Sequence, residues 1–453
     1  MKYCSSGIKY LDEILGGGLS KASIILIAGT AGTGKTTLVL QSLSKAAENG
    51  EKVVYMPITS MSAEKMMDYF HNYSFFNDDI MIHPIDRSTI EKDPLTTLLD
   101  IGNILASTDP DRIAINPLTT MGYGFSPTER RRFFYSFDAM LQDFSAQTLM
   151  TGELSRTEIH DSILSHISDG VIFLDRQITG HRMIREMEIM KMRGMSTSQN
   201  GNSSVYEFKV EQSGISLFPK LELKTTMELM DGDRLSTGVD GLDKMISGGI
   251  PKQSTVLVVG GAGTGKTVLG LHFIIAGLML GEPGVIVLLE EHENQLIREV
   301  SRFGWDLKSF IDQGLLRIIY SNLNNISPDE HNLMIKSCIE EIGAKRLFFD
   351  NIYKLESAIS DTLELKNHIN LLTDFLKYKG ITVMLTYEVS GSFNPGQMPE
   401  VSISSIVDAI ILLHFIDEKS RFDHGISIPK LMSSDHDMSI RKYIIGNNGI
   451  EII

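Results

Sequence analysis

The sequence predicts an α/β protein with two tandem domains, each a mainly parallel sheet flanked by helices. Short aliphatic runs alternate with longer helical patterns, which is the order of strands and helices in a parallel sheet. The chain also repeats itself: residues 7–12 match residues 238–243, 231 positions later, and at the same offset a glycine-rich segment recurs. Two copies of one α/β unit therefore account for the chain.

In each copy a strand is expected to lead through the glycine-rich segment into a helix, and a second strand follows. The predicted elements are residues 23–28, 35–48 and 52–56 in the first copy, and 255–259, 266–280 and 285–289 in the second. The run 285–289 and a later one at 409–413 are uninterrupted and aliphatic, as expected of parallel strands that are buried on both faces. Both runs are too short to cross a bilayer.

The offset between the copies places the domain boundaries. We expect domains at residues 1–218 and 235–453, joined by a linker over 219–234 that lacks clear periodicity. A length of 453 residues also favours two domains over a single core.

Composition narrows the class of protein. The formal charge of −15 argues against a broad basic surface for DNA or RNA, so a nucleic-acid partner is not expected. The two cysteines, Cys4 and Cys338, form no metal-binding pair, and the first residues contain no apolar signal segment. We therefore expect a cytoplasmic protein with no membrane partner.

Both glycine-rich segments fit the pattern GxxxxGK[ST] between a predicted strand and a predicted helix. The glycines let successive backbone N–H groups turn toward a phosphate, and the following helix N-terminus favours negative charge. Lys35 and Lys266 are expected to reach the β- and γ-phosphates, while Thr36 and Thr267 offer a hydroxyl to Mg²⁺. The pattern predicts ATP and Mg²⁺ as cofactors, and two RecA-like P-loop NTPase domains. The loop residues are Gly29, Thr30, Ala31, Gly32, Thr33, Gly34, Lys35 and Thr36, and Gly260, Gly261, Ala262, Gly263, Thr264, Gly265, Lys266 and Thr267.

The two halves differ in the acids that hydrolysis needs. In the second half, the apolar strand 346–350 ends in Asp350, placed to hold the metal, and Glu290 and Glu291 follow strand 285–289, placed to activate a nucleophile. In the first half, Asn116 stands at the end of the counterpart strand 112–116. Residues 59 and 60 are Thr and Ser where the glutamates stand. We predict that the N-terminal domain binds nucleotide but is catalytically degenerate.

With these motifs and the Lys-Met-Arg-Gly segment at 191–194 in view, the chain resembles the KaiC family, the RecA-like ATPases and autokinases of the circadian clock. The resemblance covers nearly the whole chain and implies a homohexamer of two rings, with ATP at the subunit interfaces. It also implies that Lys191 and Arg193 reach the γ-phosphate of a neighbouring subunit. In the second half, Lys430 stands at the position of Lys191, and Met432 stands where the arginine would be.

The resemblance also singles out a pair of serines. Family members phosphorylate two adjacent Ser/Thr residues before an Ile-x-Asp segment, and here Ser404 and Ser405 precede Ile406 and Asp408. The alternative is that these serines only form a turn before strand 409–413, as serines often do.

We therefore predict a KaiC-like protein that hydrolyses ATP and autophosphorylates on serine in its C-terminal domain, as an ATP-dependent oligomeric signalling switch. The predicted catalytic residues are Lys266, Glu290, Glu291, Asp350 and Lys430. Two alternatives stay open: a DNA-acting ATPase of the RecA or DnaB type, which needs a basic channel, and a non-enzymatic scaffold whose assembly ATP stabilises.

Overall fold

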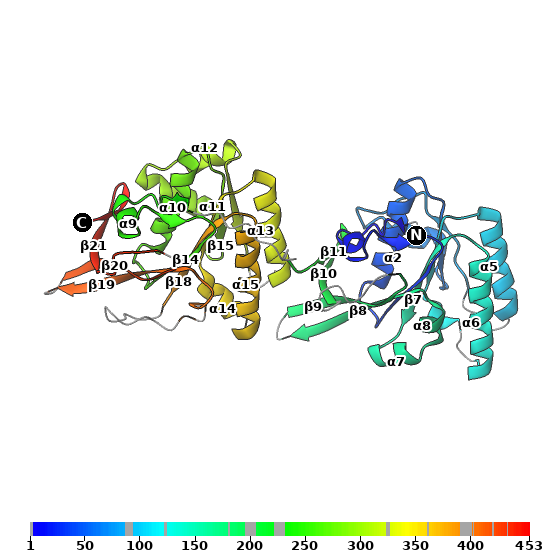
Figure 1. Cartoon of the computed structure of the whole chain (residues 1–453). Helices are drawn as coiled ribbons and strands as arrows, with labels where there is room; N and C mark the ends of the chain where they lie inside the picture. Colours follow the sequence, from blue (N-terminus) through cyan, green and yellow to red (C-terminus); the bar gives the residue numbers. More distant parts are fainter. Residues whose placement is uncertain are drawn as a thin grey trace. The chain divides into compact units, whose positions relative to one another are not determined.

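The computed structural model describes residues 3–86, 94–121, 125–179, 182–194, 205–221, 232–322, 327–359, 362–389, 401, 403–418, 421–432 and 434–453. The chain divides into two compact units, residues 1–219 and 220–453 (Figure 1). Most of the predicted linker, residues 222–231, lies outside the described residues. Within the described residues, no helix is both long and apolar enough to cross a membrane.

The amino-terminal unit contains one large sheet with nine strands among its described residues, in the order β11-β10-β9-β8-β3-β7-β6-β4-β5. Strands β8, β3, β7, β6, β4 and β5 run parallel, and β9, β10 and β11 continue the sheet in antiparallel fashion. The strands are β3 (Ile24–Gly29), β4 (Val53–Pro57), β5 (Met81–Ile82), β6 (Arg112–Asn116), β7 (Gln147–Glu153), β8 (Gly170–Thr179), β9 (Arg182–Met192), β10 (Val205–Glu211) and β11 (Gly214–Phe218).

Helices cover both faces of this sheet. Apolar side chains of α1, α2 and α3 pack with Ile25 and Ile27 of β3, while those of α5, α6, α7 and α8 pack with Leu26 on the opposite face. The helices are α1 (Leu11–Ile14), α2 (Lys35–Glu48), α3 (Ala63–Phe70), α5 (Pro94–Thr108), α6 (Pro127–Gln142), α7 (Arg156–Asp161) and α8 (Ile163–Ile167), and a small ribbon joins β1 (Tyr3–Cys4) to β2 (Leu19–Ser20).

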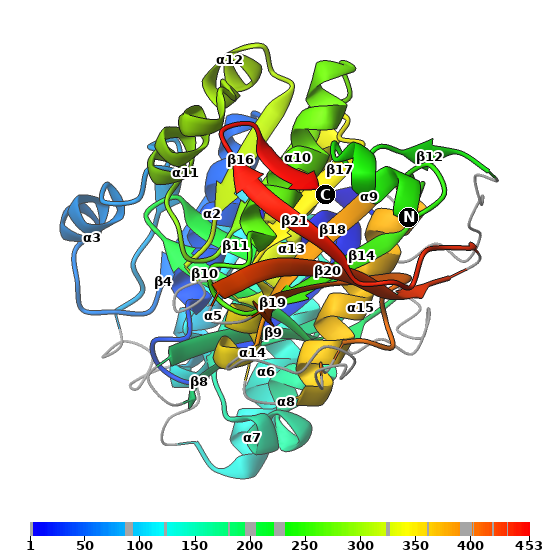
Figure 2. The ribbon, with the colours of Figure 1, turned by 90° about the vertical axis from the view of Figure 1, so that its left-hand side faces the viewer.

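The carboxyl-terminal unit repeats this plan, with nine described strands in the order β16-β15-β17-β18-β14-β19-β20-β21-β22. The first six are parallel, and β20 to β22 continue the sheet as antiparallel neighbours (Figure 2). The strands are β14 (Thr255–Gly260), β15 (Gly284–Leu288), β16 (Leu316–Tyr320), β17 (Arg346–Asp350), β18 (Thr382–Glu388), β19 (Ala409–Glu418), β20 (Arg421–Leu431), β21 (Arg441–Gly446) and β22 (Gly449–Ile452), with a short ribbon of β12 (Arg234–Leu235) and β13 (Ile250–Pro251).

Its helices also form two layers. Side chains of α9 to α12 pack with Val256 and Val258 of β14, and those of α13 to α15 pack with Leu257 and Val259. The helices are α9 (Asp240–Met245), α10 (Lys266–Met279), α11 (Glu293–Val300), α12 (Leu307–Asp312), α13 (Pro328–Ile342), α14 (Ile352–Ala358) and α15 (Thr362–Tyr378). The predicted fold class of two helix-flanked, mainly parallel sheets is confirmed.

Each unit buries an arginine at the start of an equivalent strand. Arg346 begins β17, is 1% exposed, pairs with Glu282 at 2.8 Å and donates to the carbonyls of Ser236 and Phe273. Arg112 begins β6 and donates to the carbonyls of Ser5 and Ser42 in the same way. In both units the guanidinium therefore ties the sheet to the phosphate-loop helix and to the segment that precedes it.

Buried histidines make the carboxyl-terminal unit sensitive to acid. Burial lowers the pKa of His272 from 6.5 to about 4, and its Nε2 accepts a hydrogen bond from the Ile450 backbone N–H at 2.8 Å. Burial also lowers the pKa values of His331 and His368. In the unfolded chain these histidines bind protons near pH 6.5, whereas in the folded unit they do not. Their contribution to the free energy of unfolding is therefore complete above pH 6.5 and is lost as the pH falls toward 4.

The expected loss is about 2 kcal/mol for His272 between pH 7 and pH 5. Urea midpoints monitored by the fluorescence of Trp305, the single tryptophan and a residue of this unit, measure it. His272→Gln offers an acceptor that does not titrate, so this variant should lose correspondingly less stability between the two pH values. Identical losses for the variant and the wild type would contradict the assignment.

Candidate functional site

Both phosphate loops lie at the carboxyl edge of their sheet, between the central strand and the first long helix. Each helix begins at the loop lysine and is preceded by a glycine with positive φ, 110° at Gly34 and 85° at Gly265, a conformation that other residues rarely adopt. Thr33 and Thr264 stabilise the two loops in the same way: the hydroxyl of each donates a hydrogen bond to the backbone carbonyl of the residue three positions earlier. The repeat noticed in the sequence is thus a repeat of backbone geometry.

In the carboxyl-terminal unit, the loop threonine faces the predicted metal acid. Thr267 Oγ1 donates to Asp350 Oδ2 at 2.7 Å, and the hydroxyl of Thr386 donates to the other carboxylate oxygen. Burial raises the pKa of Asp350, which hydrogen bonds from the two threonines oppose. A carboxylate beside a hydroxyl is the oxygen set that Mg²⁺ takes in phosphoryl-transfer sites, so these residues fit the ion.

The two glutamates that follow β15 have different surroundings. Glu290 pairs with Lys354 of α14 at 2.6 Å and accepts a hydrogen bond from Asn351 Nδ2 at 3.3 Å. Glu291 is half-buried, and its pKa is raised first by burial and then by Glu299 and Asp350. Burial therefore makes the Glu291 carboxylate a stronger base than an ordinary exposed glutamate, a property that the sequence alone did not provide.

A further carboxylate was missed by sequence reasoning. Glu388, the last residue of β18, pairs with Lys266 Nζ at 3.0 Å, and the same lysine donates to the Gly261 carbonyl at 2.8 Å. In the other unit Glu153 ends β7, and each glutamate lies opposite the strand glycine at which its phosphate loop begins. The recurring Thr-x-Glu at 151–153 and 386–388 was the available signal.

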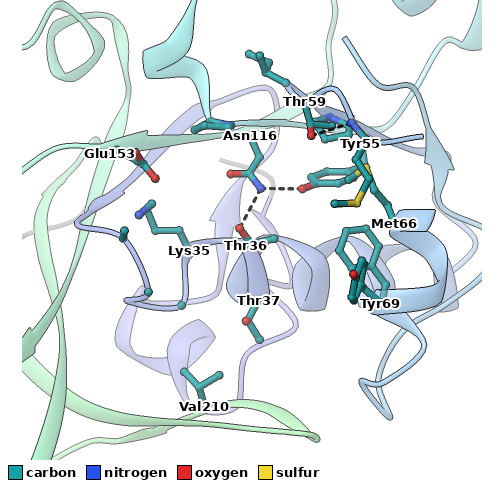
Figure 3. A pocket seen from close by; sticks show the side chains of 18 of the residues that line it. Lys35, Thr36, Thr37, Tyr55, Thr59, Met66, Tyr69, Asn116, Glu153 and Val210 are labelled. Atoms are coloured by element: carbon teal, nitrogen blue, oxygen red, sulfur yellow. Dashed lines mark hydrogen bonds between the residues drawn. The ribbon is translucent and has the colours of Figure 1, made fainter. Parts of the chain in front are cut away.

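The amino-terminal site has an amide where the other site has an acid. Asn116 Nδ2 donates to Thr36 Oγ1 at 3.0 Å and to the Tyr55 hydroxyl at 2.7 Å (Figure 3). Thr151 donates to Asn116 Oδ1 at 2.5 Å. Lys35 Nζ donates to the carbonyls of Gly29 and Thr30, where Lys266 instead uses a carbonyl and a carboxylate.

A cavity of about 570 Å³ opens beside this loop. One side is formed by loop residues with Lys35 and Thr36, and the other by apolar and aromatic side chains of α3 and neighbouring segments, including Met66, Tyr69 and Phe70 (Figure 3). Thr59 also lines the cavity, with its hydroxyl accepting from the Met61 N–H, and Ser60 is exposed. A polar phosphate cradle next to an apolar wall suits a nucleotide with its base.

The cations expected to reach a neighbouring subunit, Lys191, Arg193 and Lys430, lie at the edge of each sheet opposite the phosphate loop. Lys430 Nζ donates to the carbonyls of Ser404 and Val407, and Lys191 makes the equivalent bonds to Ser165 and Ser168. The structure therefore does not bring Lys430 together with Lys266, Glu290, Glu291 and Asp350 of its own chain.

The arginine that accompanies Lys191 has no equivalent in the second half. Arg193 pairs with Asp169 at 2.6 Å, whereas Asp408 pairs with Lys377 of α15 at 2.8 Å. Met432, at the arginine's position, is 54% exposed. Lys377 thus supplies the cation for Asp408, a replacement that comes from a different element and was not predicted.

Ser404 and Ser405 lie in the turn that Lys430 holds. Ser405 is exposed and Ser404 is half-buried, and strand β19 begins four residues after Ser405. In the amino-terminal unit, the hydroxyl of Ser165 donates to the Ile159 carbonyl at 2.7 Å.

Comparison with known proteins agrees with this paired architecture. The family model described as KaiC ATPase matches residues 4–222 and again residues 235–453. The circadian clock oscillator protein KaiC of Parathermosynechococcus lividus is 30% identical over 473 residues, which span 99% of this chain and 84% of the relative. The proteins of the same name from Picosynechococcus sp. and Synechococcus elongatus are each 28% identical, over 98% of this chain and 88% of their own length. With both halves matched and both phosphate loops in place, this chain belongs to the KaiC family of ATPases.

Proposed function

We propose that the carboxyl-terminal site hydrolyses ATP and that the amino-terminal site holds a nucleotide without turning it over. The observation that supports this division is the pair of contacts at the loop threonines, Thr267 with the carboxylate of Asp350 and Thr36 with the amide of Asn116.

Different residues of the carboxyl-terminal site would bind the metal, bind the phosphates and accept the proton. Thr267 and Asp350 would hold Mg²⁺, which neutralises phosphate charge when it is bound. Lys266 leaves its ion pair with Glu388 and binds the phosphates when ATP is present. Glu291 accepts the proton of the attacking oxygen, since burial raises its pKa. Lys354 pairs with Glu290 and holds its carboxylate in place.

Release of inorganic phosphate from ATP by the full-length protein, with and without Mg²⁺, tests hydrolysis. Absence of Mg²⁺-dependent release would leave the scaffold alternative, in which ATP only stabilises assembly. Salt-sensitive binding of single-stranded DNA, with DNA-stimulated release, would favour the DNA-acting alternative.

The register of β14 and β19 supports self-association. The phosphate loop follows Gly260 at one end of β14, whereas the Ser404–Val407 turn precedes Ala409 at the other end, because Val256 pairs with Ala409 and Gly260 with Leu413. Six residues of strand separate the two, about 20 Å. A chain cannot deliver its own γ-phosphate over that distance, so transfer to these serines requires a neighbour. We propose a hexamer in which the carboxyl-terminal site of one chain faces this turn of the next.

Ser405 is the proposed acceptor in that arrangement. Its exposed side chain lies beside a main chain that Lys430 fixes at Ser404, so the hydroxyl is accessible and positioned. Glu291 of the neighbouring chain removes the hydroxyl proton as the Ser405 Oγ–phosphorus bond forms and the bond to ADP breaks.

We expect one phosphate, on Ser405, after incubation with Mg-ATP. Phosphopeptide mapping should show that Ser405→Ala loses the label and that Ser404→Ala retains most of it. Glu290→Gln/Glu291→Gln protein is the control for labelling that does not depend on the site. Label on Ser404 alone would contradict the assignment, and unlabelled serines in a hydrolysing protein would leave a plain ATPase whose turn is only structural.

A further inference from the structure

The amino-terminal site does not fit a magnesium ion. The hydroxyl that a P-loop threonine normally offers to Mg²⁺ here accepts a hydrogen bond from Asn116 Nδ2, and the oxygen of the same amide is used by Thr151. Turning the amide over would point its oxygen at Thr36 and Tyr55 but would add no charge, whereas Mg²⁺ sites rely on carboxylates. Burial raises the pKa of Tyr55 to about 12, so the neighbouring phenol is neutral as well.

A cross-strand pair of arginines stands beside this loop. Arg176 of β8 lies opposite Arg185 of β9, and a Cβ atom on Gly32 would lie 3.2 Å from Arg176 Nη1, so that guanidinium rests against the phosphate loop. Arg185 lines the cavity, and its buried Nε has no hydrogen-bond partner among the described residues.

The equivalent pair in the other unit is a phenylalanine and a histidine. Phe415 of β19 lies opposite His424 of β20, their rings are 5.2 Å apart, and Phe415 is the side chain nearest to a Cβ placed on Gly263. The strands, the register and the position beside the loop are shared, so only the chemistry differs.

The two sites therefore differ in the sign of their excess charge: carboxylates predominate at the carboxyl-terminal site and cations at the amino-terminal site. At the carboxyl-terminal site, Lys266 pairs with Glu388 and Lys354 pairs with Glu290. Asp350 and Glu291 add two further carboxylates, an excess of negative charge that a dication would offset. Around the amino-terminal loop, the described cations are Lys35, Arg176 and Arg185. The described carboxylate of the cavity, Glu153, lies on the Lys35 side rather than beside Thr36 (Figure 3).

We propose that the amino-terminal site binds a nucleoside polyphosphate without its magnesium ion, with Arg176 and Arg185 supplying the charge that the metal supplies in the other site. Guanidinium groups suit this exchange because their N–H donors match phosphate oxygens and they are always charged. The inference rests on the proposed nucleotide-holding function of this site.

Binding stoichiometry of the full-length wild-type protein tests the proposal. Equilibrium dialysis with the non-hydrolysable analogue AMP-PNP should give two molecules per chain with Mg²⁺ and one with EDTA. Titration with Mn²⁺ in saturating AMP-PNP should give one tight Mn²⁺ per chain. Two Mn²⁺ per chain, or loss of both nucleotides in EDTA, would overturn the inference while leaving nucleotide binding by this site intact.

Variants assign the retained nucleotide to a site. In Lys266→Ala protein, EDTA should change the AMP-PNP affinity by less than about threefold, and in Lys35→Ala protein it should lower the affinity at least about tenfold. Arg185→His places at this position the residue type of His424 in the other unit, and it should weaken AMP-PNP binding in EDTA at least about tenfold. Asn116→Asp should raise the number of tightly bound Mn²⁺ ions per chain to two. Absence of binding in the Lys266→Ala protein under both conditions would overturn the nucleotide-holding function itself.

Discussion

Lys266→Ala is expected to remove nearly all ATP turnover, whereas Lys35→Ala should leave it within a few-fold of the wild type. Lys266 contacts the loop at the Gly261 carbonyl and pairs with Glu388, so the groups that it touches are acceptors that cannot take over its role. Loss of a preorganised electrostatic donor of this kind lowers kcat by roughly 10²–10³-fold. Phosphate release under saturating Mg-ATP measures the effect, and Lys35→Ala is the matched control because the two lysines begin equivalent helices.

The two variants also distinguish the alternatives. Retained turnover in the Lys266→Ala protein, with loss in the Lys35→Ala protein, would reverse the proposed division of labour. Equal partial losses would mean that both sites hydrolyse ATP, in which case Asn116 would not impair the amino-terminal site. A change in assembly alone, with no phosphate release from the wild type, would favour the scaffold.

Arg346→Met is expected to lower the free energy of unfolding of the carboxyl-terminal unit by about 3–5 kcal/mol. The guanidinium is 1% exposed, so its removal leaves Glu282 and the carbonyls of Ser236 and Phe273 without the donor that satisfies them. It also packs over the Phe273 ring, with 4.9 Å between the guanidinium carbon and the ring centroid, a contact that methionine reproduces only in part. The urea midpoint followed by Trp305 fluorescence reports this unit.

Arg317→Met is the control for loss of an arginine as such. Arg317 pairs with Glu341 at 2.7 Å in an exposed setting, where ion pairs contribute little, so the midpoint should barely move. If both variants shifted the midpoint equally, burial of Arg346 would not be the cause.

The parts of the molecule that were predictable from the sequence are those encoded by neighbouring residues. The two loops, the helices that begin at Lys35 and Lys266, and the strand that ends in Asp350 are local patterns, and the offset of 231 made each half a check on the other. Asn116 could likewise be compared with Asp350, because both end a short apolar run.

The partners of these residues were not predictable in the same way. Glu388 meets Lys266 because β18 pairs with β14 in a particular register, and Lys377 reaches Asp408 from a helix that the sequence reasoning did not connect to it. Arg176 and Arg185 were not singled out from the sequence, and only strand pairing places them opposite each other beside the loop. Strand order and register depend on the whole sheet, and a single sequence does not display them.

The parallel pairing of β14 with β19 has a kinetic consequence. The phosphate donor and the Ser405 turn of one chain lie at opposite ends of the same strands. If a neighbouring chain phosphorylates Ser405 as we propose, the labelling rate would depend on how many chains have a neighbour. Dilution below the association threshold would then stop modification of Ser405 while each chain still binds ATP. The extent of phosphorylation would thus record the abundance of the protein itself as well as the supply of nucleotide.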